Sequence, residues 1–79
     1  MEYQPINCSF YDELEARATL RRLCQITYRD ESGGLQRAEG VIQDFFIREK
    51  AEYLLLSTGQ AIRLDRLIVV DGLPVPRAC

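Results

Sequence analysis

The sequence predicts a small, mainly β domain with one N-terminal α-helix, folded as a strongly bent sheet or an open barrel. Beyond about residue 22, short segments of alternating polarity recur, with turn signals about every ten residues. One helical pattern precedes them. A chain of 79 residues has room for a single modest core, so we expect residues 1–79 to form one domain.

The helix is expected at about residues 10–20. Ser9 is the candidate N-cap, and Asp12, three residues later, resembles the second member of a capping box. The apolar residues of this segment recur at intervals of four and form one stripe: Phe10, Leu14 and Ala18. The acidic residues lie mostly off that stripe, so the helix is expected to be amphipathic and acidic on its outer side.

The strands are expected at about residues 23–28, 35–44, 52–58, 61–64 and 67–71. Gly33 and Gly34 mark a turn, and Gly40 marks a bulge or bend that lets the sheet curl. The charged stretch Arg48–Lys50 is interpreted as a loop. The tail 72–79 contains two prolines and is expected to be loose. SH3-like and Sm-like barrels have this number and length of strands.

Composition argues against an enzyme. The chain has no histidine, which removes the commonest general base and zinc ligand. Asp12 and Glu15 are one helical turn apart, but no apolar pocket is evident that would raise a pKa. The three cysteines are widely spaced, so we expect free thiols and neither a metal ligand nor a disulfide at Cys8. No cofactor is expected.

The acidic charge is concentrated at one end. Residues 1–16 contain four acids and no base, whereas the remainder contains eight acids and ten bases. The first turn of a helix favours an acid, which accounts for Asp12. Glu15 and Glu2 are left unexplained by helix structure. An outward acidic patch could instead bind the basic groove that another protein offers to nucleic acid.

The aliphatic runs are too short to span a bilayer, and the N-terminus has no secretory pattern. We therefore expect a cytoplasmic protein with no membrane contact. We also expect the protein to be a monomer.

The motif Tyr3-Gln4-Pro5-Ile6-Asn7-Cys8, followed by Tyr11-Asp12 and Leu14-Glu15, resembles the opening of the Rof family, the Rho-binding antiterminators of bacteria. The resemblance continues more weakly through residues 52–54 and 63–67, and only the N-terminal motif is specific. It implies an Sm-like barrel with an N-terminal helix. It also implies a non-enzymatic inhibitor that occupies the primary RNA-binding surface of the termination factor Rho and blocks RNA loading.

The resemblance also implies the residues that contact Rho. In the N-terminal motif and its helix they are Tyr3, Asn7, Cys8, Tyr11, Asp12 and Glu15; Arg48 and Lys50 match a basic loop. Glu13 is not a matching position, but we include it among the expected contacts for its charge. At Ser9 and Phe10 the chain departs from the pattern, because a family member has two acids there. Glu13 or Glu2 would then supply the missing charge.

Two alternatives remain open. One is an Sm-like RNA-binding module, because small barrels of this kind commonly bind RNA. The net charge of −2 opposes phosphate binding, so we expect no direct contact with nucleic acid. The other is an unrelated protein-interaction domain of the same architecture.

Overall fold

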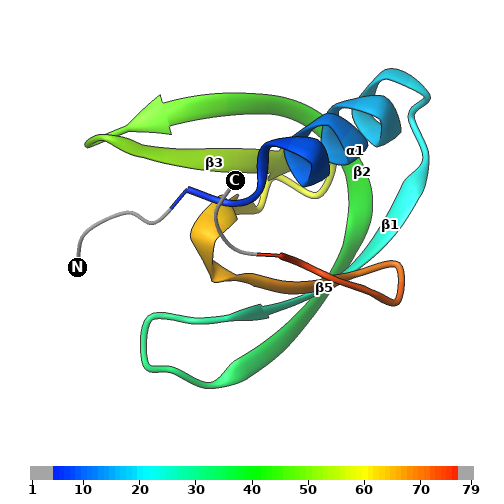
Figure 1. Cartoon of the computed structure of the whole chain (residues 1–79). Helices are drawn as coiled ribbons and strands as arrows, with labels where there is room; N and C mark the ends of the chain where they lie inside the picture. Colours follow the sequence, from blue (N-terminus) through cyan, green and yellow to red (C-terminus); the bar gives the residue numbers. More distant parts are fainter. Residues whose placement is uncertain (1–4, 77–79) are drawn as a thin grey trace.

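The computed structural model describes residues 5–76. Its elements are α1 (Cys8–Thr19), β1 (Leu23–Arg29), β2 (Leu35–Arg48), β3 (Ala51–Leu56), β4 (Ala61–Arg63), a 3-10 turn η1 (Leu64–Arg66), β5 (Leu67–Val70) and β6 (Leu73–Pro74). The six strands form one antiparallel sheet in the order β4-β3-β2-β1-β5-β6. The sheet curls strongly, and α1 lies across its open side (Figure 1). The predicted fold class is confirmed.

Strand β2 joins the two halves of the curled sheet. Its first half pairs with β1, from Leu35 to Val41, and its second half pairs with β3, from Ile42 to Arg48. Gly40 lies at the change of partner, as the sequence predicts for a bend. A Cβ at Gly40 would lie 3.3 Å from Ser57 Oγ and 3.4 Å from Leu56 Cβ, so the absence of a side chain lets the two strands approach.

The concave side of the sheet and the helix enclose one hydrophobic core. From α1 come Phe10 and Leu14, as the four-residue stripe predicts, and Ala18 packs at the edge of the core. The fully buried side chains include Ile26, Ile42, Leu54, Leu56, Leu64, Leu67 and Val70. A helix of 12 residues is only marginally stable alone. Packing against the sheet therefore supplies most of its stability.

The helix begins earlier than predicted, because Asn7 rather than Ser9 is its N-cap. The Asn7 side-chain oxygen accepts hydrogen bonds from the backbone N–H groups of Ser9 (2.9 Å) and Phe10 (3.2 Å). Ser9 therefore lies inside the first turn. Asp12 lies beyond it, and the first turn contains no acid. The prediction that Asp12 stabilises the helix N-terminus is wrong.

Two other boundaries differ from the sequence prediction. Arg48 belongs to β2 and not to a loop, because the chain reverses in the two residues Glu49 and Lys50. Both have positive φ, at 50° and 66°, as a tight primed hairpin turn requires. Such a turn normally carries Gly or Asn, so its usual sequence signal is missing here.

The tail is not loose as far as residue 76. Leu73 and Pro74 form β6, which pairs with β5 at the edge of the sheet, where a proline is tolerated. Val75 is buried, and the backbone N–H of Asn7 donates to the carbonyl of Pro76 at 3.2 Å. The tail thus joins the core and lies against the start of α1. Residues 77–79 are outside the described residues.

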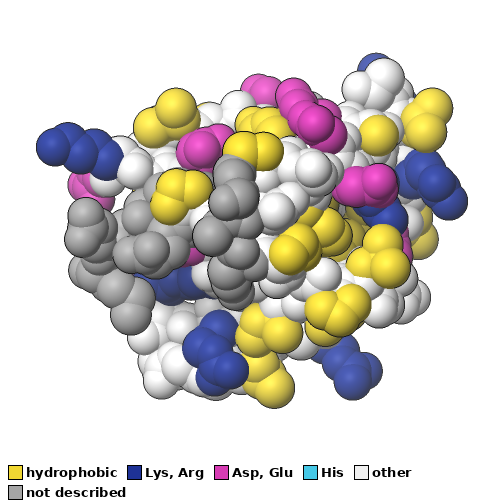
Figure 2. Space-filling view, viewed as in Figure 1, with side chains coloured by type: hydrophobic (Ala, Val, Ile, Leu, Met, Phe, Trp, Pro, Cys, Tyr) yellow, Lys and Arg dark blue, Asp and Glu magenta, His cyan; other side chains and the backbone are white. Residues whose placement is uncertain are grey.

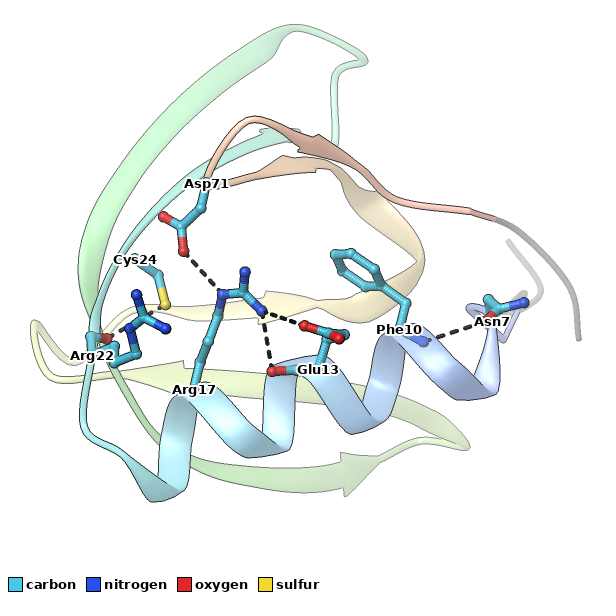
Figure 3. A network of polar contacts seen from close by, with 7 residues as sticks. All are labelled: Asn7, Phe10, Glu13, Arg17, Arg22, Cys24 and Asp71. Carbon is cyan, nitrogen blue, oxygen red and sulfur yellow. Dashed lines mark hydrogen bonds and ion pairs between the residues drawn. The ribbon is translucent and has the colours of Figure 1, made fainter.

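An ionic network ties the end of α1 to the sheet (Figure 3). The Asp71 carboxylate accepts hydrogen bonds from Arg17 Nε at 3.0 Å and from the backbone N–H of Gln25 at 2.9 Å. Partial burial alone would raise the pKa of Asp71, but these two bonds lower it below its ordinary value. Arg17 also pairs with Glu13 at 3.2 Å. Asp71 therefore connects the helix, β1 and the β5–β6 turn.

Replacing Asn7 with Ala should lower the free energy of unfolding by about 1 kcal/mol, because two backbone N–H groups lose their acceptor. Ser9→Ala is the control and should change stability by no more than about 0.5 kcal/mol. Urea denaturation followed by circular dichroism measures both. A larger loss of unfolding free energy for Ser9→Ala than for Asn7→Ala would show that Ser9 and not Asn7 is the N-cap.

The Asp71 network predicts a pH-dependent contribution to stability. Because the pKa of Asp71 is lowered in the folded state, its contribution is present above the unfolded value of 3.8 and is lost as pH falls through the folded value. Asp71→Asn should melt below wild type at pH 7, and the difference should shrink on acidification below about pH 4. Asp12→Asn, on the exposed side of α1, is the control. A difference that stays constant with pH would contradict the ionic account.

Candidate partner-binding surface

The N-terminal helix meets the β2–β3 hairpin through an aromatic contact. The rings of Tyr11 and Phe45 have their centroids 5.2 Å apart and their planes tilted by 37°. Both residues are half-buried, and both pack against the hydrophobic core. Phe45 also pairs across the strands with Leu54, which is fully buried. The Tyr11 ring is therefore held by rigid neighbours, although part of it remains at the surface.

Two carboxylates lie near the Tyr11 phenol. Burial raises the pKa of the Tyr11 phenol, and the carboxylates of Glu52 and Glu15 raise it further. The Tyr11 phenol therefore stays protonated and can donate a hydrogen bond, although carboxylates lie near it. Asp12 is exposed on the same helix, three residues before Glu15. Acidic side chains gather over α1 in Figure 2, whereas Lys and Arg side chains lie toward the edges of the view.

Ile47 adds an apolar contact beside the acids. It follows Phe45 at the two-residue interval of a strand, so both side chains lie on the same face of β2. Ile47 is 73% exposed and pairs across the strands with Glu52. We define the acidic-aromatic face by the following residues of α1 and the β2–β3 hairpin, with Asp12 included for its exposed position on α1: Tyr11, Asp12, Glu15, Phe45, Ile47 and Glu52.

Three of the predicted contact residues belong to this face, namely Tyr11, Asp12 and Glu15. Glu13 does not, because its carboxylate pairs with Arg17 on the side of α1 that meets Asp71 (Figure 3). The hydrogen bond to Asp71 raises the pKa of Arg17 against the effect of partial burial, and the bond to Glu13 raises it further. Part of the Glu13 charge is thus neutralised within the domain.

The two predicted basic residues lie at the far end of the β2–β3 hairpin. The Arg48 guanidinium lies over the Phe46 ring, 5.2 Å from its centroid. Phe46 alternates with Phe45 along β2, so the Arg48 side chain lies on the opposite face from Tyr11. Lys50 is exposed in the adjoining turn. The structure therefore separates Arg48 from the acidic-aromatic face.

The start of the motif has a structural role in this chain. Asn7 caps α1, as described above. Cys8 is disulfide-bonded, which overturns the expectation of a free thiol there. Cys24 is a free, buried thiol, and it donates to the carbonyl of Arg22 at 3.4 Å. Glu2, Tyr3 and Cys79 are outside the described residues.

Sequence reasoning missed Phe45, Ile47 and Glu52. A signal for the first two was present in the run Phe45-Phe46-Ile47, since a strand continued through it would place alternate residues on opposite faces. Ending the predicted strand at Asp44 hid this alternation. Glu52 could not be assigned to the face from sequence, because its position depends on the register between β2 and β3.

Two further features of residues 5–76 bear on other classes of function. No group of three or more acidic or cysteine side chains gathers there in a way that could hold a metal ion. In the same part of the chain, α1 is the longest helix and is too short and too polar to cross a bilayer.

No protein-family model and no curated protein sequence matches this chain.

Proposed function

We propose that this chain inhibits transcription termination by binding the termination factor Rho at its primary RNA-binding surface, where it blocks the loading of RNA. The observation that carries the proposal is the acidic-aromatic face. It places the carboxylates of Glu15 and Glu52 near Tyr11, which packs on Phe45, and Asp12 is exposed on the same helix. The resemblance of the N-terminal motif to the Rof family supplies the partner, and α1, which contains the second half of that motif, contributes half of the face.

Electrostatics supports competition with RNA. A protein surface that binds RNA is basic, so the carboxylates of Asp12, Glu15 and Glu52 would be attracted to it as phosphates are. The attraction mainly raises the rate of association. Because the Glu13 charge is paired with Arg17, Glu52 replaces it as a source of negative charge on this face.

The aromatic and aliphatic side chains would fix the orientation of the complex. Aromatic residues buried at the centre of an interface contribute much of the binding energy, and the contacts around them exclude water. Tyr11 is held by Phe45, and Ile47 projects beside them with most of its surface exposed. Tyr11 loses little conformational freedom on binding, because its packing against Phe45 and the core already restricts the ring.

The purified domain should lower the affinity of Rho for cytosine-rich RNA, and Glu15→Lys should weaken this effect. Because the charge on the acidic-aromatic face is reversed, the association rate with Rho should fall about threefold to tenfold at low salt. Fluorescence-polarisation competition and binding kinetics measure the two effects. Glu31→Lys, in the β1–β2 turn, makes the same charge change elsewhere and should have little effect.

The proposal fails if Rho retains its RNA at saturating concentrations of the wild-type domain. If Glu15→Lys melts like wild type and binds Rho equally well, Glu15 is not part of the contact. Tight, salt-sensitive binding of the free domain to RNA at physiological salt, without any effect on Rho, would favour the Sm-like RNA-binding alternative.

Ile47→Ala tests the apolar part of the same face. Ile47 is 73% exposed, so this variant should change the free energy of unfolding by no more than about 0.5 kcal/mol. Its complex with Rho should dissociate several-fold faster, with little change in the association rate. Leu35→Ala, at an exposed leucine on the first residue of β2, is the matched control. Equal dissociation rates for the two variants would remove Ile47 from the contact.

A further inference from the structure

The opposite side of the β2–β3 hairpin has a different chemistry. Phe46 and Tyr53 are partners in the strand register, and their rings lie parallel within 3°, with centroids 5.1 Å apart. The Arg48 guanidinium lies over Phe46, 5.2 Å from the ring centroid. We call these three residues the Arg48 column. It presents a cation over the Phe46 ring, and that ring is stacked in turn on Tyr53.

This column is separated from the acids of the other face by the pleat of the sheet. Phe45 meets Tyr11 on the helix side, so Phe46 and its partner Tyr53 lie on the outer side. Two exposed cations, Arg48 and Lys50, lie at the hairpin tip together with one exposed acid, Glu49. The net charge of −2 therefore describes the whole chain but not this end of the hairpin.

A groove of about 360 Å³ adjoins the column and is lined by both aromatic and basic side chains. Tyr53 of the column forms part of its wall, and its strand partner Arg63 forms another part. Two hydrogen bonds to Asp65, of 2.9 and 2.7 Å, fix the position of the Arg63 guanidinium. Arg29 and Arg66 also line the groove, opposed by acids that include Glu31 and Glu49.

The geometry points to a second binding site, in which the Arg48 column takes a single-stranded nucleic acid, with one base stacked on the Arg48 guanidinium and neighbouring phosphates on Arg48 and Lys50. Bases of single strands stack on guanidinium planes as well as on aromatic rings. A guanidinium can also bind phosphate in a bidentate manner. Because Phe46 already orders Arg48, less conformational entropy is lost on binding.

The site is independent of the proposed Rho contact, since it lies on the other face of the hairpin and needs no partner protein. The acids at the groove oppose phosphate, so we expect binding that is weak at physiological salt and clear at low salt. Substitutions that remove base stacking should therefore lower RNA affinity more than substitutions that remove charge alone.

The test uses the full chain and a labelled 12-nucleotide oligocytidine RNA, with fluorescence anisotropy at 20 and 200 mM salt. Arg48→Gln should weaken binding about fivefold or more at 20 mM salt. Arg37→Gln is the matched control, because it removes the same charge from the first half of β2 and should have a smaller effect. Phe46→Leu keeps the Arg48 charge but removes the ring beneath it, and it should weaken binding while melting within a few degrees of wild type.

Several results would overturn the site. The first is that wild type binds no oligocytidine at 20 mM salt. The second is that Arg48→Gln and Arg37→Gln lose RNA affinity equally, which would indicate diffuse charge attraction. Unchanged affinity in a folded Phe46→Leu variant would exclude stacking. If Phe46→Leu fails to fold, the comparison of Arg48→Gln with Arg37→Gln still shows whether the Arg48 column binds RNA. An Arg48→Gln variant that loses Rho binding while wild type binds no RNA would assign Arg48 to the protein contact instead.

Discussion

The change of partner along β2 is the constraint on which the rest of the structure depends. One strand pairs with two neighbours in succession, and Gly40 favours this change because a Cβ there would lie only 3.3 Å from Ser57 Oγ and 3.4 Å from Leu56 Cβ. A backbone hydrogen bond from Ser57 to the Val41 carbonyl, at 2.8 Å, joins the segments at this point. The curl that results leaves one side of the sheet open. That open side is where α1 lies, so the bend in β2 creates the place for the helix and hence the acidic-aromatic face.

The fold could be predicted from the sequence because its main determinants are local. The four-residue stripe of α1 and the alternation of the strands are patterns of polarity, and burial follows them at Phe10, Leu14 and Ile26. The boundaries were less predictable where a tertiary contact replaces the usual local signal. Asn7 caps the helix while its own N–H is bonded to Pro76, and Pro74 is held in β6 by pairing with β5. Neither contact can be inferred from nearby sequence.

The candidate site was predictable only in the part contributed by the helix. Tyr11, Asp12 and Glu15 follow from the N-terminal motif and from helical spacing. The contribution of the sheet depends on register, since shifting β3 by one residue against β2 would turn Glu52 away from Ile47. The separation of Glu13 from the other acids likewise depends on a distant residue, because Asp71 holds Arg17 on that side of the helix. Counting charges along the sequence therefore overestimates the negative charge that α1 presents, because Glu13 is paired with Arg17. It also misses the negative charge that Glu52 adds from β3.

The β2–β3 hairpin shows how a domain of this size can carry two surfaces of opposite character. Phe45 and Phe46 are adjacent in sequence, but the pleat directs one ring to Tyr11 and its carboxylates and the other to Tyr53 and Arg48. The two faces share one backbone, and the tight turn at Glu49 and Lys50 restricts how they can move relative to each other. A ligand on either face would meet a side chain already ordered by a neighbouring ring. The proposed Rho contact and the proposed nucleic-acid site therefore use different side chains of the same hairpin.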